Sequence, residues 1–229
     1  MHSHGSRQVG FTLMEIMVVV AIIAVFAALA VPSWRTYQQN LQLRAAARSV
    51  SNAFSYARAH ALATGNRHVV VFAVDPGFPN DVCGNAIEDV QGNPVPMLVF
   101  EDLDDNCCLD AGELRLSERA VPGVNWGVMP APPAGPGASP QDAGAGDYST
   151  GSSFAEPDGS DAAWISFGPD GIPLAFNAAC NLGVTGTGAG AIYLTNGLAN
   201  SPRNYAIVLN PLGTGNVERF DTAQNQWEN

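Results

Sequence analysis

The feature that most constrains this chain is an apolar run close to its N-terminus. Residues 11–31 contain a single charged side chain, Glu15. At 1.5 Å per residue, a helix of this length spans roughly 30 Å, the thickness of the hydrocarbon part of a bilayer. Arg7 precedes the run, so we expect the start of the chain to stay in the cytoplasm and the rest to be exported. The run therefore predicts a single membrane-spanning helix.

Glu15 argues against two simpler interpretations of this run. A carboxylate inside a bilayer is costly, and neither a disposable signal peptide nor a plain anchor has a reason to carry one. A signal peptide would also end at a small-residue cleavage site, whereas the helical pattern continues without a break beyond Ala28–Ala30. A buried carboxylate is tolerable where it meets a cation, and a polymer of packed helices supplies the N-terminal amine of a neighbouring chain.

Residues 10–15, with the sequence GFTLME, resemble the prepilin cleavage and methylation signature of type IV pilins and type II secretion pseudopilins. The resemblance implies cleavage between Gly10 and Phe11 by a prepilin peptidase, followed by N-methylation of Phe11. It implies that Glu15 faces the free amine of a neighbouring subunit during assembly. It also places Pro32 where many pilins carry a proline that loosens the helix.

The resemblance makes residues 1–10 a leader peptide and residues 11–32 a transmembrane and polymerisation helix. Residues 33–64 are expected to form the amphipathic half of the same helix, with a kink near Pro32. The sequence at residues 64–66 (Thr-Gly-Asn) is typical of a helix end. The apolar positions of the amphipathic half are Tyr37, Leu41, Ala45, Val50, Phe54, Ala57 and Ala61.

Residues 65–229 have the composition of a β-rich domain, with short β-branched and aromatic runs between turns rich in Gly, Pro, Asn and Asp. One long helix followed by many short strands predicts an α+β, pilin-like fold with the helix packed on antiparallel β-sheet. Residues 129–161, rich in Pro, Gly, Ala and Ser, are expected to form a flexible loop. Strands are expected at residues 67–74, 96–100, 114–117, 124–128, 164–167, 174–176, 191–195, 205–210 and 217–220.

The order of these pieces is similar to that of the GspH/FimT pseudopilins and minor pilins. The similar segments are residues 57–65, 69–72, 99–104, 165–171 and 205–210. The resemblance implies a single-pass inner-membrane protein with a periplasmic C-terminal domain. It implies partners that are other pseudopilins or minor pilins, the prepilin peptidase and an inner-membrane assembly platform, in type II secretion or in pilus assembly. The alternative function is a ligand-binding module at a pilus tip, for adhesion or DNA uptake.

The charge of the chain argues against DNA binding, and its lack of catalytic motifs argues against enzyme activity. The residues from 64 onward hold 20 acidic residues against five arginines, so this stretch should repel nucleic acid phosphates. DNA-binding relatives carry a basic final hairpin, whereas residues 213–220 here hold Arg219 next to Glu218. No G-x-S-x-G, phosphate loop or His-Glu-x-x-His motif is present, so we expect no enzyme activity and no required cofactor.

The four cysteines, Cys83, Cys107, Cys108 and Cys180, all lie in the part expected to be exported. An even count there fits two disulfides. A vicinal bridge would strain the bond geometry, so we expect Cys107 and Cys108 to take different partners, in an order that the sequence leaves open. Zinc binding is the alternative, but no C-x-x-C pair exists and the histidines lie far from the cysteines in sequence.

Residues 102–113 have the ligand spacing of an EF-hand-type calcium loop. Cys107 replaces the turn-forming glycine at loop position 6, and strands rather than helices are expected on both sides. The alternative is a polar β-hairpin tip in which Asp and Asn serve turn formation. A bound calcium ion would be structural rather than catalytic. Its ligands would be Asp102, Asp104, Asn106, Cys108, Asp110 and Glu113.

Overall fold

A computed structural model describes residues 11–73, 79–113, 115–118, 123–126, 150–198, 203–221 and 226–228, with the side chains of residues 28–33, 117–118 and 226 left out. The chain divides into two compact units, Met1–Gln39 and Asn40–Asn229. The second unit contains all the described strands together with the C-terminal half of the helix.

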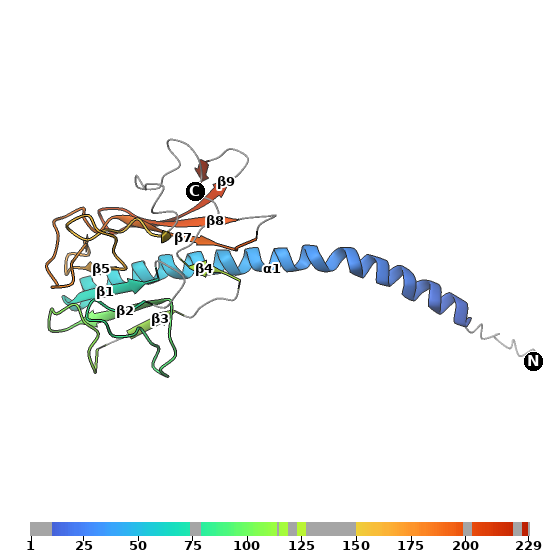
Figure 1. Ribbon diagram of the computed structural model, residues 1–229, viewed down its shortest axis with the longest axis horizontal. Helices are drawn as coiled ribbons and strands as arrows, with labels where there is room; N and C mark the ends of the chain where they lie inside the picture. Colours follow the sequence, from blue (N-terminus) through green and yellow to red (C-terminus); the bar gives the residue numbers. More distant parts are fainter. Residues whose placement is uncertain are drawn as a thin grey trace, which may run out of the picture. The chain divides into compact units, whose positions relative to one another are not determined.

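One helix, α1 (Leu13–Thr64), precedes every described strand (Figure 1). It ends where predicted, because Gly65 takes a left-handed φ of 75° and its N–H donates to the Ala61 carbonyl at 3.0 Å. Glycine adopts this conformation without steric cost, which makes it the usual residue just beyond a helix. The helix runs through Pro32 without a break, and the kink there stays a prediction.

In the described part of the chain, ten strands form two antiparallel five-stranded sheets. The first has the order β3 (Arg115–Glu118), β2 (Met97–Asp102), β1 (Arg67–Phe72), β5 (Trp164–Phe167), β6 (Pro173–Leu174). The second has the order β10 (Gln226–Glu228), β9 (Gly215–Asp221), β8 (Asn204–Leu209), β7 (Gly190–Thr195), β4 (Asn125–Trp126). The predicted α+β class is confirmed, and β10 is a strand that the sequence did not predict.

The main core joins α1 to both sheets, and Figure 1 shows the helix between β1–β3 on one side and β7–β9 on the other. The buried side chains of α1 are Leu43, Ala46, Ala47, Val50, Ala53, Phe54, Ala57 and Ala61. Their many alanines let strands approach the helix closely. The predicted apolar face was right from Val50 onward and wrong before it. Tyr37 precedes the unit that begins at Asn40, and Leu41 and Ala45 are on the solvent side of α1.

Residues 150–161, the last part of the loop expected over residues 129–161, have a defined structure. Phe154 is buried, with its ring centroid 6.0 Å from that of Phe54 and 5.1 Å from that of Phe72. A Cβ at Gly190 would lie 2.8 Å from the Phe154 ring, so glycine is required for this close approach. The aromatic side chain attaches residues 151–154 to the core, whereas residues 157–161 are exposed. Residues 127–149 lie outside the described residues.

Two tandem turns with nearly the same sequence, DVCGN at residues 81–85 and DVQGN at residues 89–93, follow β1. Asp81 accepts hydrogen bonds from the backbone N–H groups two and four residues later, at 3.0 and 2.7 Å, and the aspartate that starts the second turn does the same. The N–H of Ile87 donates to the Pro79 carbonyl, and the N–H of Val95 donates to that of Ile87. The turns therefore stack with a repeat of eight residues.

Candidate functional site

The first candidate site is the start of α1, where Thr12 and Glu15 form a capping box. The Oε2 atom of Glu15 accepts hydrogen bonds from the N–H and the hydroxyl of Thr12, both at 3.0 Å. The N–H of Glu15 donates to the Thr12 hydroxyl oxygen at 3.2 Å. This exchange satisfies backbone donors that a helix start otherwise leaves unpaired. The Thr-x-x-Glu spacing was visible in the sequence, but sequence reasoning assigned Glu15 only to a contact with a neighbour.

The apolar side chains that follow the capping box are exposed all around the helix. Every residue from 11 to 27 is exposed, with 84% of Phe11 and 68% of Phe26 accessible. A helix that is apolar on all sides requires an apolar surrounding, either lipid or other helices. Gly10 lies outside the described residues. Within the described ranges, no helix combines the length and the hydropathy needed to cross a membrane.

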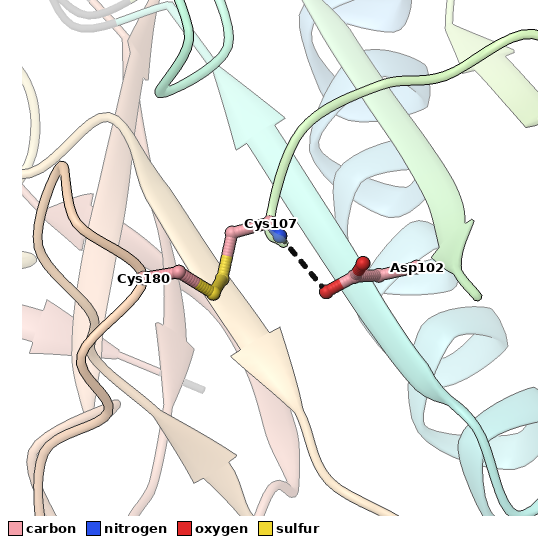
Figure 2. A group of neighbouring side chains, drawn as sticks. All are labelled: Asp102, Cys107 and Cys180. Atoms are coloured by element: carbon pink, nitrogen blue, oxygen red, sulfur yellow. Dashed lines mark hydrogen bonds between the residues drawn. A yellow bond between two sulfur atoms is a disulfide. The ribbon is translucent and has the colours of Figure 1, made fainter. Parts of the chain in front are cut away.

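The second candidate site lies between two disulfides, Cys83–Cys108 and Cys107–Cys180. The expectation of two bridges without a vicinal one is confirmed, and the structure shows which cysteines pair. Figure 2 shows the Cys107–Cys180 bridge next to Asp102, whose carboxylate accepts the Cys107 N–H at 3.1 Å. Sulfur atoms in a disulfide are not thiolates, so this trio does not offer a zinc site.

The predicted cation loop connects β2 to β3, which pair as an antiparallel hairpin. Asp102, the first ligand position, is 1% exposed and its Oδ1 accepts the Asn106 N–H at 3.0 Å. Glu113, the last position, is 8% exposed and accepts the N–H groups of Leu103 and Asp110 at 3.1 and 2.8 Å. The two carboxylates thus hold both ends of the loop together.

The remaining ligand positions point to the same place. The side-chain amide nitrogen of Asn106 donates to the carboxylates of Asp104 and Asp110, both at 2.8 Å. One oxygen each from Asp102, Asp104 and Glu113 lie within 4.8 Å of one another. The structure therefore brings the side chains at loop positions 1, 3, 5, 9 and 12 together, and the amide hydrogens of Asn106 supply the positive partner of two of the carboxylates.

Cys107 occupies the loop position where an EF-hand loop carries glycine. Its φ of 62° lies in the left-handed region that glycine adopts freely and other residues adopt at a cost. The disulfide to Cys180 and the hydrogen bond to Asp102 hold the residue in this conformation. The departure from the loop pattern is therefore one of residue type and not of backbone conformation.

Arg67, at the start of β1, supplies the positive charge at this site. Its guanidinium lies 3.3 Å from the Asp102 carboxylate and 3.2 Å from that of Asp105. It also lies 3.5 and 3.4 Å from the sulfur atoms of Cys107 and Cys180. Sequence reasoning missed Arg67, because the register that places it opposite Asp102 joins residues 35 positions apart.

Burial dominates the electrostatics of the loop. It raises the pKa of the Asp102 carboxyl, while the Cys107 N–H and the Arg67 guanidinium act in the opposite direction. It also raises the pKa of Glu113, and the nearby charge of Asp102 adds to this shift. Burial therefore disfavours the charged form of both carboxylates. Asp81 is a second residue that sequence reasoning missed. Its carboxylate accepts the Leu109 N–H at 2.9 Å and so joins the loop to the DVCGN turn at residues 81–85.

Two comparisons with protein families match this chain. The family model described as type II transport protein GspH matches residues 46–213, from the buried part of α1 to the turn after β8. The prokaryotic N-terminal methylation motif matches residues 5–31, which include Gly10, Phe11 and Glu15. No curated protein and no solved structure matches the chain significantly.

Proposed function

We propose that this chain, which belongs to the GspH family of type II transport proteins, is a minor structural subunit that polymerises with other pseudopilins and catalyses no reaction. Its family and its methylation motif support a role as a type II secretion pseudopilin or type IV pilin. In our proposal a prepilin peptidase cleaves between Gly10 and Phe11, and Phe11 is then N-methylated. Residues 11–32 hold the precursor in the inner membrane, and the second unit lies in the periplasm.

One observation carries the proposal: the methylation motif is continuous with an exposed, apolar stretch of helix that holds one acid. In the single chain, the Glu15 carboxylate accepts hydrogen bonds from Thr12, the residue that precedes α1. Cleavage would create a free amine at Phe11, two residues before the first residue of α1. In a bundle of such helices the amine of one chain can meet the Glu15 carboxylate of another, and an inner-membrane assembly platform would then raise the subunit into the filament.

Processing and assembly are tested together in a strain that makes the neighbouring pseudopilins. Mass spectrometry of the mature protein is expected to find N-methylated Phe11 at its start. Gly10→Val is expected to leave the precursor uncleaved in the membrane fraction and absent from sheared filaments. A mature chain that begins at Val31 or later would overturn the proposal, because the polymerisation helix would have been discarded. A Gly10→Val chain found in filaments at the wild-type level would do the same.

We further propose that residues 102–113 bind a structural calcium ion. The support is the convergence of the predicted ligands together with the left-handed φ at Cys107. Asp102, Asp104, Asn106, Asp110 and Glu113 would contribute side-chain oxygens, and Cys108 its backbone carbonyl. A cation there would neutralise carboxylates that burial now disfavours in their charged form. The ion would stabilise the hairpin and take part in no reaction.

Calcium binding is tested by thermal unfolding of the full-length chain in detergent, with Ca²⁺, Mg²⁺ or a chelator. Calcium at 100 times its dissociation constant should add about 2.7 kcal/mol to the free energy of unfolding. Asp104→Asn combined with Asp110→Asn should abolish the increase, whereas Asp158→Asn, in a turn elsewhere, should not. An increase that persists in the double variant would contradict the proposal.

A further inference from the structure

Two neighbouring aromatic side chains of α1 are exposed just beyond its apolar stretch. Trp34 is 61% exposed and Tyr37 is 56% exposed, and their ring centroids lie 6.1 Å apart. Among the described residues beyond residue 27, every other Phe, Tyr and Trp side chain is at least partly buried. A pair of rings that the chain leaves outside its own packing indicates a contact surface for a partner.

The position of this pair along the helix matches the boundary of a bilayer. Between Glu15 and Arg35 the sequence contains no charged side chain. At 1.5 Å per residue, the helix rises about 28 Å from Glu15 to Trp34. The hydrocarbon part of a bilayer is roughly 30 Å thick, so the acid and the indole lie at opposite boundaries of it when α1 stands across the membrane.

The chemistry of the side chains also fits such a boundary. Tryptophan and tyrosine each join a flat apolar ring to a hydrogen-bond donor, which can reach lipid ester and phosphate oxygens while the ring stays among the upper parts of the lipid chains. Arg35 is exposed and makes no ion pair within the described residues. Its long side chain can extend to a lipid phosphate. All three side chains therefore suit phospholipid headgroups.

We propose that Trp34 and Tyr37 lie in the phospholipid headgroup layer on the periplasmic side of the inner membrane and fix the depth of α1 before assembly. The inference rests on the proposed function, which holds residues 11–32 in this membrane. At this depth Glu15 lies in the opposite headgroup layer, where water stabilises its charge in addition to the hydrogen bonds from Thr12. The carboxylate then enters apolar surroundings only when the subunit is drawn into a filament.

The test measures the depth of Trp34 in a membrane. The full-length chain is placed in vesicles of phosphatidylcholine and phosphatidylglycerol whose acyl chains carry bromine, a quencher of tryptophan fluorescence, either near the headgroup or near the chain end. The Trp34 signal is the difference between the wild type and Trp34→Phe, because the other tryptophans, all in the second unit, give the same background. Shallow bromine should quench this signal at least about twofold more strongly than deep bromine.

Tyr37→Leu tests whether the two rings act together. Leucine prefers the hydrocarbon layer, so Trp34 should move inward and the ratio of shallow to deep quenching should fall to about one. Tyr56→Leu is the matched control, since it makes the same change on the same helix but in the second unit, where the Tyr56 ring lies 4.0 Å from that of His60. It should leave the ratio unchanged. Each variant is compared with its own Trp34→Phe counterpart, and circular dichroism shows that its fold is kept.

The other outcomes decide against the proposed contact. Equal quenching by the two lipids, stronger quenching by deep bromine, or no quenching overturns it, as does a ratio that Tyr37→Leu leaves unchanged. Filament incorporation is measured separately in cells that make the neighbouring pseudopilins. Wild-type incorporation without the expected quenching refutes the headgroup contact alone. The expected quenching without any incorporation refutes the proposed polymerisation and retains the headgroup contact.

Discussion

The Glu15 carboxylate accepts two hydrogen bonds from Thr12, one from its N–H and one from its hydroxyl, in the same helix turn. The acid that our proposal gives to a neighbouring subunit therefore already has a partner in the single chain. Assembly would replace this local partner by an amine of opposite charge, an exchange that is favourable where water is absent. The Glu15 carboxylate would thus have two roles, capping its own helix and pairing with the amine of a neighbour. Substituting Glu15 and Thr12 in turn separates these roles.

Glu15→Val is expected to leave the protein in the membrane fraction and to remove it from filaments, because no acid remains to receive the neighbouring amine. Glu15→Gln should fail in the same way, since an amide has no charge to pair with the amine. The measurement is co-purification with the other pseudopilins after gentle detergent extraction. Recovery of the Glu15→Val chain with its neighbours at the wild-type level would refute the role of Glu15 in assembly.

Thr12→Val is the matched control for the capping role. It removes the hydroxyl partner of Glu15 and keeps the acid. If assembly depends on the charge, this variant should enter filaments at close to the wild-type level. A loss as large as that of Glu15→Val would instead mean that the cap, and not the contact between subunits, explains the effect.

The stability of the second unit should fall in mildly acidic solution because of His68. This side chain is 1% exposed, its Nε2 has no hydrogen-bond partner in the described residues, and burial lowers its pKa below the usual 6.5. The unfolded chain then binds more protons than the folded chain once the pH falls to about 6.5. The stability present above this pH should be lost progressively between about 6.5 and the lowered pKa of the folded state.

Urea denaturation of the wild type and of His68→Gln between pH 7.5 and pH 5 measures this effect. The slope of unfolding free energy against pH should flatten in His68→Gln, whose side chain does not titrate. His60→Gln, a change at the neighbouring ring, should keep most of the slope. An unchanged slope in His68→Gln would show that other groups cause the acid sensitivity.

Removing the Cys107–Cys180 bridge should destabilise the second unit by about 2–4 kcal/mol, since the bridge closes a loop across 73 positions of sequence.

The bridge also holds Cys107 in its left-handed conformation, and calcium affinity measures this second effect separately from stability. With Cys180→Ser, a Cys107→Ser chain should lose calcium affinity, because serine does not hold the left-handed φ of 62°. A Cys107→Gly chain with the same Cys180→Ser change should recover affinity, because glycine adopts that conformation freely. Calorimetric titration with Ca²⁺ compares the two, and equal affinities would contradict the argument.

Phe154→Ala should cost about 3–5 kcal/mol of unfolding free energy, the usual effect of removing a buried phenylalanine side chain. The ring lies between Phe54 of α1 and Phe72 of β1. Val90→Ala, at a side chain that is 75% exposed, should change the free energy by about 0.5 kcal/mol or less. Chemical denaturation measures both, and a small effect at Phe154 would mean that its ring does not belong to the core.

The sequence predicted most of the fold because its signals are local. The strand Trp164–Phe167 was predicted with its observed bounds, since a short apolar run there ends at a turn rich in glycine and proline. Phe154 was missed because it is one aromatic residue in a stretch of Gly, Ser, Pro and Asp. Residues 102–113 were identified as a candidate calcium loop from their spacing alone, and calcium binding there stays a prediction. Arg67 and Asp81 were not identified, because only the pairing of distant strands and turns brings them to the loop.

The disulfide pattern has a consequence for the intact subunit. Cys107 and Cys108 are adjacent, and their partners Cys83 and Cys180 lie on opposite sides of them in the sequence. A protease that cuts the backbone at any one point between Cys83 and Cys180 therefore leaves two fragments that a sulfur–sulfur bond still joins. As long as both bridges stay oxidised, a nicked subunit remains one covalent molecule, and its fragments separate only after reduction.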